Sequence, residues 1–376
     1  MPPMEIDRRA ALAAMAAGAA AAICPALARP AEGLLFAAAR RGPDGRYSAA
    51  IFSPDGRDVT SVVLPARGHD IAVCPSTRRC VAFARRPGNF AVVFSADRGE
   101  APAVFEAPEQ RHFYGHGVFS PDGRLLYTTE NDFEAGRGVI GIYDATARFR
   151  RIGEFASHGV GPHDLAFLSS PNVLVIANGG LREHPDIGDG RRVLNLDAIE
   201  TSLVYVDVRS GTLLEKHVIP AGGALSLRHL EVGQNDTVVL GAQIVKGVPG
   251  GHPLTEALIY RHRRQAPLVA TSLPGEASAA LSGYVSSVAV DSSGTVAAAT
   301  SSKSGSVVMI DVAAGTLLGI EAMADVSGVS RRGPPGDFLL TSGTGKIAEV
   351  LAGGGSVAAT AEAVCNWDNH AVYLGA

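Results

Sequence analysis

Short apolar runs separated by turn sequences recur along most of the chain. The runs are rich in β-branched and aromatic side chains, as in Phe90–Phe94, Val173–Ala177 and Val307–Asp311. The clearest turns, Ser53–Gly56 and Ser120–Gly123, both read Ser-Pro-Asp-Gly. Proline presets φ and Asp-Gly tolerates the positive φ of a tight hairpin, so each turn joins two antiparallel strands. No segment after residue 33 carries a long helical period, and the pattern predicts an all-β fold.

Three histidines mark a repeat in this pattern. His69, His116 and His163 are spaced 47 residues apart, and each comes just before an apolar run. A period of this length is typical of a four-stranded propeller blade. Aligning the turns extends the series to seven starts: His69, His116, His163, His229, Ser286, Ser327 and His370.

The last start leaves room for one strand, at residues 371–374. We expect the other three strands of that blade at residues 34–40, 47–52 and 59–64. The sequence therefore predicts a single seven-bladed β-propeller over residues 33–376. Its ring would be closed by the C-terminal strand joining the N-terminal strands, which hides the edges of both.

The first 28 residues have the pattern of an export signal. Arg8-Arg9 precedes the apolar run Ala10–Ile23, and Ala26-Leu27-Ala28 offers a cleavage site. The arginine pair predicts a twin-arginine (Tat) signal peptide and a periplasmic location, and a general secretory signal is the alternative. The apolar run is too short for a stable membrane span.

Composition narrows the class of partner. The net charge is −4 and the basic residues are not clustered, so we expect no nucleic-acid partner. Cys74 and Cys80 flank a predicted hairpin loop, where an oxidising compartment permits a disulfide, but two reduced thiols fit the sequence equally well. Because a propeller closes on itself, we expect a monomer.

Five of the seven repeat starts are histidines, and this suggests a metal or haem site. In a propeller, equivalent residues form one ring around the central channel. Neutral imidazoles from several blades can then bind one ion, with iron, copper or haem as the expected cofactors. The candidate ligands are His116, His163 and His229, then His69, His370 and a lid residue, His184. The candidate supporting carboxylates are Asp70, Asp164, Glu130, Asp132 and Asp368.

Other roles for these residues stay open. A histidine at a repeat start also forms hydrogen bonds between strands in other propellers, so a structural or anion-binding role is the alternative. Long loops at residues 130–134, 178–202 and 246–256 are expected on the same face as the histidines. Four arginines, which we expect to be solvated, could bind an anion there: Arg182, Arg191, Arg192 and Arg228.

Several motifs resemble one bacterial family, domain of unknown function 1513. They are Gly115–Gly123, Gly161–Leu165, Asn178–Asp186, Leu194–Leu196, Leu227–Leu230 and Asn366–His370. The resemblance implies an exported propeller related to the WD40, YVTN and quinoprotein amine dehydrogenase-like groups. It also implies a link to iron acquisition, with imelysin-like and di-haem periplasmic proteins as partners. The family has no established reaction, so the resemblance assigns no catalytic residue.

Three functional hypotheses follow. The first is a periplasmic propeller that binds a metal or haem compound and serves iron uptake, and we expect this binding role rather than an enzyme. The chain also has no G-x-S-x-G nucleophile elbow. The second is a lactonase-like or quinoprotein-like enzyme, with a channel histidine as general base or with Asp164 and His163 positioning water. The third is an interaction scaffold that docks a partner on residues 178–202.

Overall fold

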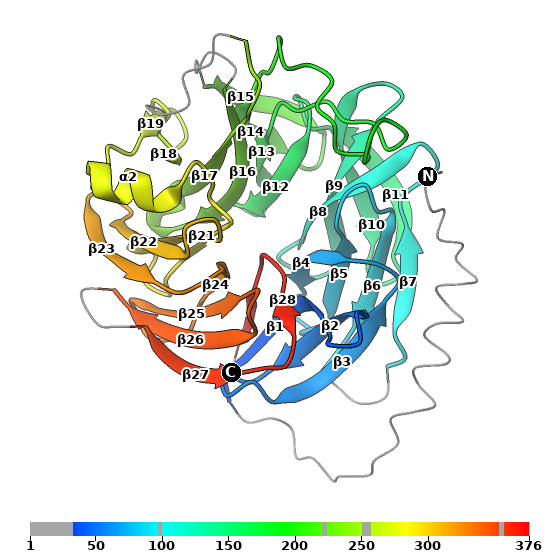
Figure 1. The fold of residues 1–376 in the computed structure, drawn as a ribbon. Coiled ribbons are helices and arrows are strands. Elements are labelled where there is room, and N and C mark those ends of the chain that lie inside the picture. The colour runs from blue at the N-terminus through cyan, green and yellow to red at the C-terminus, as the bar shows by residue number, and fades with distance from the viewer. Residues whose placement is uncertain (1–32, 97–99, 220–223, 250–256, 353–356, 376) are drawn as a thin grey trace.

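The computed structural model describes residues 33–96, 100–219, 224–249, 257–352 and 357–375. The predicted signal peptide, residues 1–28, and most of the predicted loop at residues 246–256 lie outside the described residues. Seven antiparallel sheets stand around a central axis (Figure 1). This confirms the predicted seven-bladed propeller.

Six blades follow one another along the chain. Blade 1 contains β4 (Gly68–Val73), β5 (Cys80–Ala84), β6 (Phe90–Phe94) and β7 (Ala103–Glu106). Blade 2 contains β8 (Arg111–Phe119), β9 (Leu125–Asp132), β10 (Arg137–Asp144) and β11 (Arg150–Ala156). Blade 3 contains β12 (Pro162–Phe167), β13 (Val173–Asn178), β14 (Ser202–Asp207) and β15 (Thr212–Val218). Blade 4 contains β16 (Leu225–Val232), β17 (Val238–Ile244), β18 (Ile259–His262) and β19 (Val269–Ala270).

Blade 5 contains β20 (Ser287–Val290), β21 (Val296–Ser301), β22 (Ser306–Asp311) and β23 (Leu317–Ala322). Blade 6 contains β24 (Val326–Arg331), β25 (Asp337–Ser342), β26 (Lys346–Leu351) and β27 (Ala358–Glu362). A 3-10 turn (Gln234–Asp236) joins β16 to β17, and a short helix, α2 (Gly275–Leu281), precedes blade 5. Helix α2 buries Ala277 and Leu281.

Blade 7 is built from both ends of the described chain. It contains β1 (Leu35–Arg41), β2 (Tyr47–Phe52), β3 (Asp58–Leu64), β28 (Asn366–Trp367) and β29 (Val372–Gly375). Both β28 and β29 pair with β1, and in Figure 1 the red β28 lies beside the blue β1. Strand β29 therefore occupies the position nearest the axis, as β4, β8, β12, β16, β20 and β24 do in the other blades. We call these seven the inner strands.

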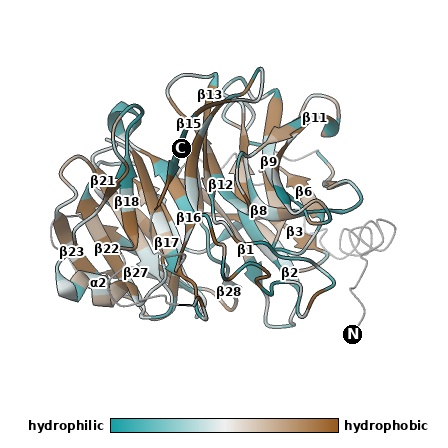
Figure 2. Ribbon diagram, turned by 90° about the horizontal axis from the view of Figure 1, so that it is seen from above, coloured by the Kyte–Doolittle hydropathy of each residue, from teal (hydrophilic) through white to brown (hydrophobic). Residues whose placement is uncertain are grey.

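The core lies between successive blades. Blades 1 and 2, for example, bury Phe83, Phe113 and Tyr143 in one cluster. Figure 2 shows hydrophobic stretches along many of the strands, with hydrophilic residues interspersed. The described residues contain no helix long and apolar enough to cross a membrane. Both Cys74 and Cys80 are free thiols.

The packing of β29 makes a first testable prediction. Leu374 is 7 % exposed and packs in the cluster that blades 7 and 1 share. We expect Leu374→Ala to lower the free energy of unfolding by about 2–4 kcal/mol, because a buried leucine leaves a cavity when it is truncated. Urea denaturation measures the change. The matched control is Leu351→Ala, at a leucine that is 55 % exposed, which should cost less than about 0.5 kcal/mol. Equal effects of the two substitutions would contradict the packing of β29.

Candidate functional site

Five of the six predicted histidine ligands meet at the axis of the propeller. We call His69, His116, His163, His229 and His370 the histidine cluster. Their rings form a closed circuit in which neighbouring ring centroids are 4.6–4.9 Å apart. Each of the five side chains is at most 6 % exposed. Residues from five blades are thereby brought into contact in the interior of the channel.

A β-bulge at each histidine of blades 1 to 4 interrupts the inner strand. The register of β4 with β5 shifts between Gly68 and Ile71, and that of β12 with β13 shifts between Pro162 and Asp164. Similar shifts surround His116 in β8 and His229 in β16. A bulge adds an unpaired residue and re-aims the side chains around it. The strict alternation of faces expected for a flat strand therefore does not hold at the cluster.

Gly115 allows His69 to pack against the next blade. Its φ is +107°, in a region that favours glycine, and a Cβ atom there would lie 2.6 Å from Cδ2 of His69. Any larger residue at this position would displace the His69 ring. The glycine that precedes His116 thus serves the histidine of the neighbouring blade.

Each carboxylate beside the cluster contacts a histidine that belongs to a neighbouring blade. Nδ1 of His116 lies 3.2 Å from Asp70 of blade 1 and 3.4 Å from Asp164 of blade 3. Asp368 approaches Nδ1 of His69 at 3.6 Å, and it also pairs with Arg67 and Arg85. The partner of Asp164 is therefore His116, whereas the enzyme hypothesis paired it with the adjacent His163.

The carboxylates set the charge of the cluster. Burial by itself would lower the pKa of His116, but Asp164 and Asp70 outweigh it and raise that pKa to about 10. Burial lowers the pKa of His370 to about 4. It also lowers the pKa values of His69, His163 and His229 far below the usual range, and neighbouring cations add to the effect. One imidazolium is thus surrounded by four neutral imidazoles.

Four ring nitrogens of the cluster are buried and have no hydrogen-bond partner among the described residues. They are Nε2 of His116, Nε2 of His370, Nδ1 of His163 and Nδ1 of His229. The other nitrogens of His116 and His370 are held, by Asp70 and Asp164 and by the hydroxyl of Ser287 at 3.1 Å. Buried polar atoms in proteins are nearly always paired, which makes the cluster a candidate ligand site.

The cluster offers two sets of three nitrogen ligands that share His116. One set is His69, His116 and His163, and the other is His116, His229 and His370. Within each set the ring nitrogens lie within 4.8 Å of one another. A metal–nitrogen bond is about 2.0–2.1 Å long, so small side-chain rotations would bring three nitrogens onto one ion.

Three predicted site residues lie outside the cluster. His184 contacts Glu134 at 3.4 Å and packs on the ring of Phe133. Glu130 is buried within blade 2, where Tyr143 and Arg151 donate hydrogen bonds to it at 3.0 and 2.7 Å. Asp132 pairs with Arg137 at 2.8 Å. The prediction placed Glu130 and Asp132 in a loop, but β9 continues through Asp132, so both carboxylates bind groups of their own blade and the loop beside it.

Cavities lie on both sides of the cluster. On the face where the inner strands begin, a small cavity of about 30 Å³ reaches His69, His163 and His229. We call it the arginine pocket, and its other main lining residues are Arg85, Arg86, Arg191, Arg228, Tyr114 and Tyr284. On the opposite side, a cavity of about 510 Å³ reaches His116, His229 and His370. We call it the axial cavity, and Asp70, Asp164 and Glu231 line it.

Arg228 corrects the expectation that the arginines are solvated. Its side chain belongs to a residue that is 4 % exposed, and burial together with Arg86 lowers its pKa to about 9. The bulge in β16 includes both Arg228 and His229, which places neighbouring residues around the same channel. The sequence signal was the Leu-Arg-His-Leu motif itself, in which a charged residue sits between apolar ones.

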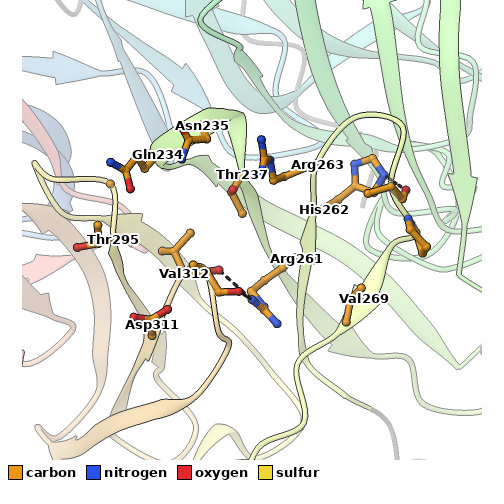
Figure 3. Close-up of a pocket in the computed structure, with 14 residues that line it drawn as sticks. Gln234, Asn235, Thr237, Arg261, His262, Arg263, Val269, Thr295, Asp311 and Val312 are labelled. Atoms are coloured by element: carbon orange, nitrogen blue, oxygen red, sulfur yellow. Dashed lines mark hydrogen bonds between the residues drawn. The ribbon is translucent and has the colours of Figure 1, made fainter.

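A further pocket of about 350 Å³ lies away from the axis, between blades 4 and 5 (Figure 3). Two of its polar side chains are already engaged: Arg261 donates to the carbonyl of Val312 at 2.9 Å, and the ring nitrogens of His262 bind Tyr205 and Ala266. Neighbouring His217 and Glu215 complete a possible ligand set with His262, but Arg264 binds Glu215 at 2.7 Å. This region offers no donor set comparable to the histidine cluster.

Comparison with known proteins agrees with the fold. A sequence model of the family described as "Protein of unknown function (DUF1513)" matches residues 62–374. No curated protein sequence matches the chain.

Solved structures of low sequence identity share the architecture. A chain of the Kuenenia stuttgartiensis hydrazine synthase has a TM-score of 0.61 and 14% identity, over 83% of this chain and 94% of that one. The Cps50 (Swd1) β-propeller domain of Myceliophteria thermophila gives 0.57 and 10%, over 83% and 93%. A chain of a mitotic checkpoint complex gives 0.55 and 12%, over 77% and 75%. At such identities these likenesses show the fold alone.

The buried neutral histidines predict an acid-sensitive fold. The unfolded chain protonates them near pH 6.5, whereas the folded protein keeps them neutral to a lower pH. Their contribution to stability is therefore complete above pH 6.5 and is lost as the pH falls towards 4. The loss is about 1.4 kcal/mol per pH unit for each histidine. His116 acts in the opposite sense, because its contribution is present below pH 6.5 and is lost as the pH rises towards 10.

Urea unfolding of metal-free protein at pH 7, 6 and 5 measures this dependence. We expect His229→Gln to reduce the slope of the unfolding free energy against pH by about 1.4 kcal/mol per pH unit, which is the contribution of one proton. An unchanged slope would mean that His229 is not held neutral in the folded protein.

Proposed function

This chain belongs to the DUF1513 family of proteins of unknown function, and we propose that its histidine cluster binds a transition-metal ion. The observation that carries the proposal is the set of four buried ring nitrogens without a partner, contributed by four blades. Their number and convergence exceed what packing between strands requires. A histidine that only joined strands would have both nitrogens bound or one exposed to solvent.

The donor set fits a first-row metal such as iron or copper. Neutral imidazole suits iron, copper, nickel and zinc, and nitrogen donors generally bind copper most tightly. His116 can bind an ion through Nε2 once that nitrogen releases its proton, while Asp70 and Asp164 hold the proton on Nδ1. Such a carboxylate–histidine–metal arrangement orients the ring and raises its basicity. Ser287 orients His370 in the same way.

A bare ion fits the cluster better than haem does. Neighbouring imidazole rings are already within 4.6–4.9 Å of one another, which leaves no slot for a macrocycle among them. Haem would require the rings to separate, and the inner strands that carry them contact one another around the axis. We therefore assign the cluster to an ion held in the interior of the channel.

We further propose that the protein serves iron handling in the periplasm. Because residues of five blades surround the site, the donor set supports tight binding of one ion. The imelysin-like and di-haem proteins implied by the family resemblance are the partners to test. Nothing in the donor set points to a reaction, so the proposal is limited to metal binding.

Removal of two ligands tests the proposal. We expect His116→Ala/His229→Ala to abolish stoichiometric binding of iron or copper, because His116 belongs to both sets of ligands. Metal analysis and titration calorimetry of protein loaded after chelator treatment measure the binding. The control is His184→Ala, which removes a histidine outside the cluster and should bind metal as the parent does. Parent-like binding by the double variant would refute the proposal, as would an absence of binding in the parent.

The carboxylate support makes a separate prediction. Asp70→Asn keeps the shape of the side chain but weakens its hold on Nδ1 of His116. We expect metal affinity to fall about 10–100-fold, the usual effect of losing such an outer partner. Asp132→Asn, at a carboxylate outside the cluster, is the matched control and should leave the affinity unchanged. Calorimetry of both variants at one pH decides the matter.

A further inference from the structure

We propose that the arginine pocket binds a small oxyanion, a carboxylate or an inorganic oxyanion, directly against the histidine cluster. The proposal adds a ligand to the site described above. It rests on different residues, because the arginines and Tyr114 are not metal ligands. Its first observation is an excess of buried positive charge on one side of the cluster.

The positive charge is only partly compensated. Arg86 pairs with Glu183 at 3.3 Å, and Asp368 pairs with both Arg67 and Arg85. Arg228 forms no close ion pair with any residue in the part of the chain that the structure describes, and the carboxylate of Glu183, which pairs with Arg86, acts on it from a greater distance. A buried guanidinium without a close counterion is costly, because burial removes its hydration. An anion in the pocket would supply the missing charge.

Hydrogen-bond donors also point to an anion. Nε of Arg228, Nε of Arg85 and the hydroxyl of Tyr114 are buried and have no partner. All three residues line the arginine pocket. Guanidinium groups offer several N–H donors in a planar fork that matches the oxygens of a carboxylate or phosphate. The unsatisfied atoms are thus of the kind that an oxyanion binds.

The size and position of the pocket restrict the ligand. A cavity of about 30 Å³ accommodates one small group rather than a nucleotide or a sugar. Its lining includes His69, His163 and His229, so a bound oxyanion lies beside the proposed ion. Arg191 belongs to the long insertion at residues 178–202 and also lines the pocket, which makes the insertion part of the binding site.

A thermal-shift and calorimetry experiment tests the proposal in metal-free protein. The probes are inorganic phosphate and acetate, which distinguish an inorganic oxyanion from a carboxylate, with chloride at equal ionic strength as the reference. We expect at least one oxyanion to raise the melting temperature above that in chloride, since a ligand of the folded state stabilises it. We expect Arg228→Gln to weaken that binding at least about tenfold, because it removes charge-assisted hydrogen bonds.

Two variants keep the result unambiguous. Arg192→Gln, on the same insertion but not lining the pocket, should bind the oxyanion as the parent does. Without added oxyanion, Arg228→Gln should melt no lower than the parent, because it removes a buried charge that lacks a partner. Lack of a specific oxyanion shift in the parent would overturn the proposal, and so would parent-like binding by Arg228→Gln.

The same titration separates this inference from the metal proposal. Oxyanion binding by chelated protein that never takes up iron or copper would support the arginine pocket and refute the ion. The opposite result is metal binding that no oxyanion changes, with no oxyanion binding to the metal-free protein. It would support the ion and refute the arginine pocket.

Discussion

The narrowness of the ring where the inner strands begin governs the chemistry of this protein. Five imidazoles fill the axis there, with neighbouring ring centroids 4.6–4.9 Å apart. Side chains at that distance in a dry interior cannot all carry charge, because like charges repel strongly at low dielectric. One proton is therefore concentrated on His116, between two carboxylates, and the other four rings stay neutral. Neutral rings are the form that binds metals, so an ion at the cluster would displace the proton from Nε2 of His116.

The two faces of the cluster differ in charge. Three carboxylates, of Asp70, Asp164 and Glu231, and one arginine, Arg331, line the axial cavity, while four arginines line the cavity on the opposite side. A cation held at the cluster is thus supported by negative charge from one direction. An anion reaching it from the other direction meets guanidinium groups first. The cluster lies at the boundary between these two fields, where a metal and an oxyanion would meet.

The fold could be predicted from the repeats and turns, because both depend on local backbone chemistry. The Pro-Asp-Gly turns and the 47-residue step gave seven starts that fall within or next to the inner strands, although β8 begins at Arg111, before the predicted start at His116. Placing five histidines on one ring followed from the same reasoning. The bulges at the histidines of blades 1 to 4 could not be predicted, because the turn and repeat pattern carries no signal for an extra residue within a strand. The pairing of Asp70 and Asp164 with His116 could not be predicted either, and the same holds for the burial of Arg228. Each depends on contacts between blades.

The join within blade 7 has a consequence for when the site can exist. His69 and His370 are about 300 residues apart in sequence, yet their ring centroids lie 4.8 Å apart. A nascent chain that has emerged only through blade 6 lacks one wall of the cluster and the carboxylate of Asp368. The set of His116, His229 and His370 is therefore complete only when the C-terminal segment joins blade 7. Retention of an ion by these three histidines would show that the ring of blades had closed.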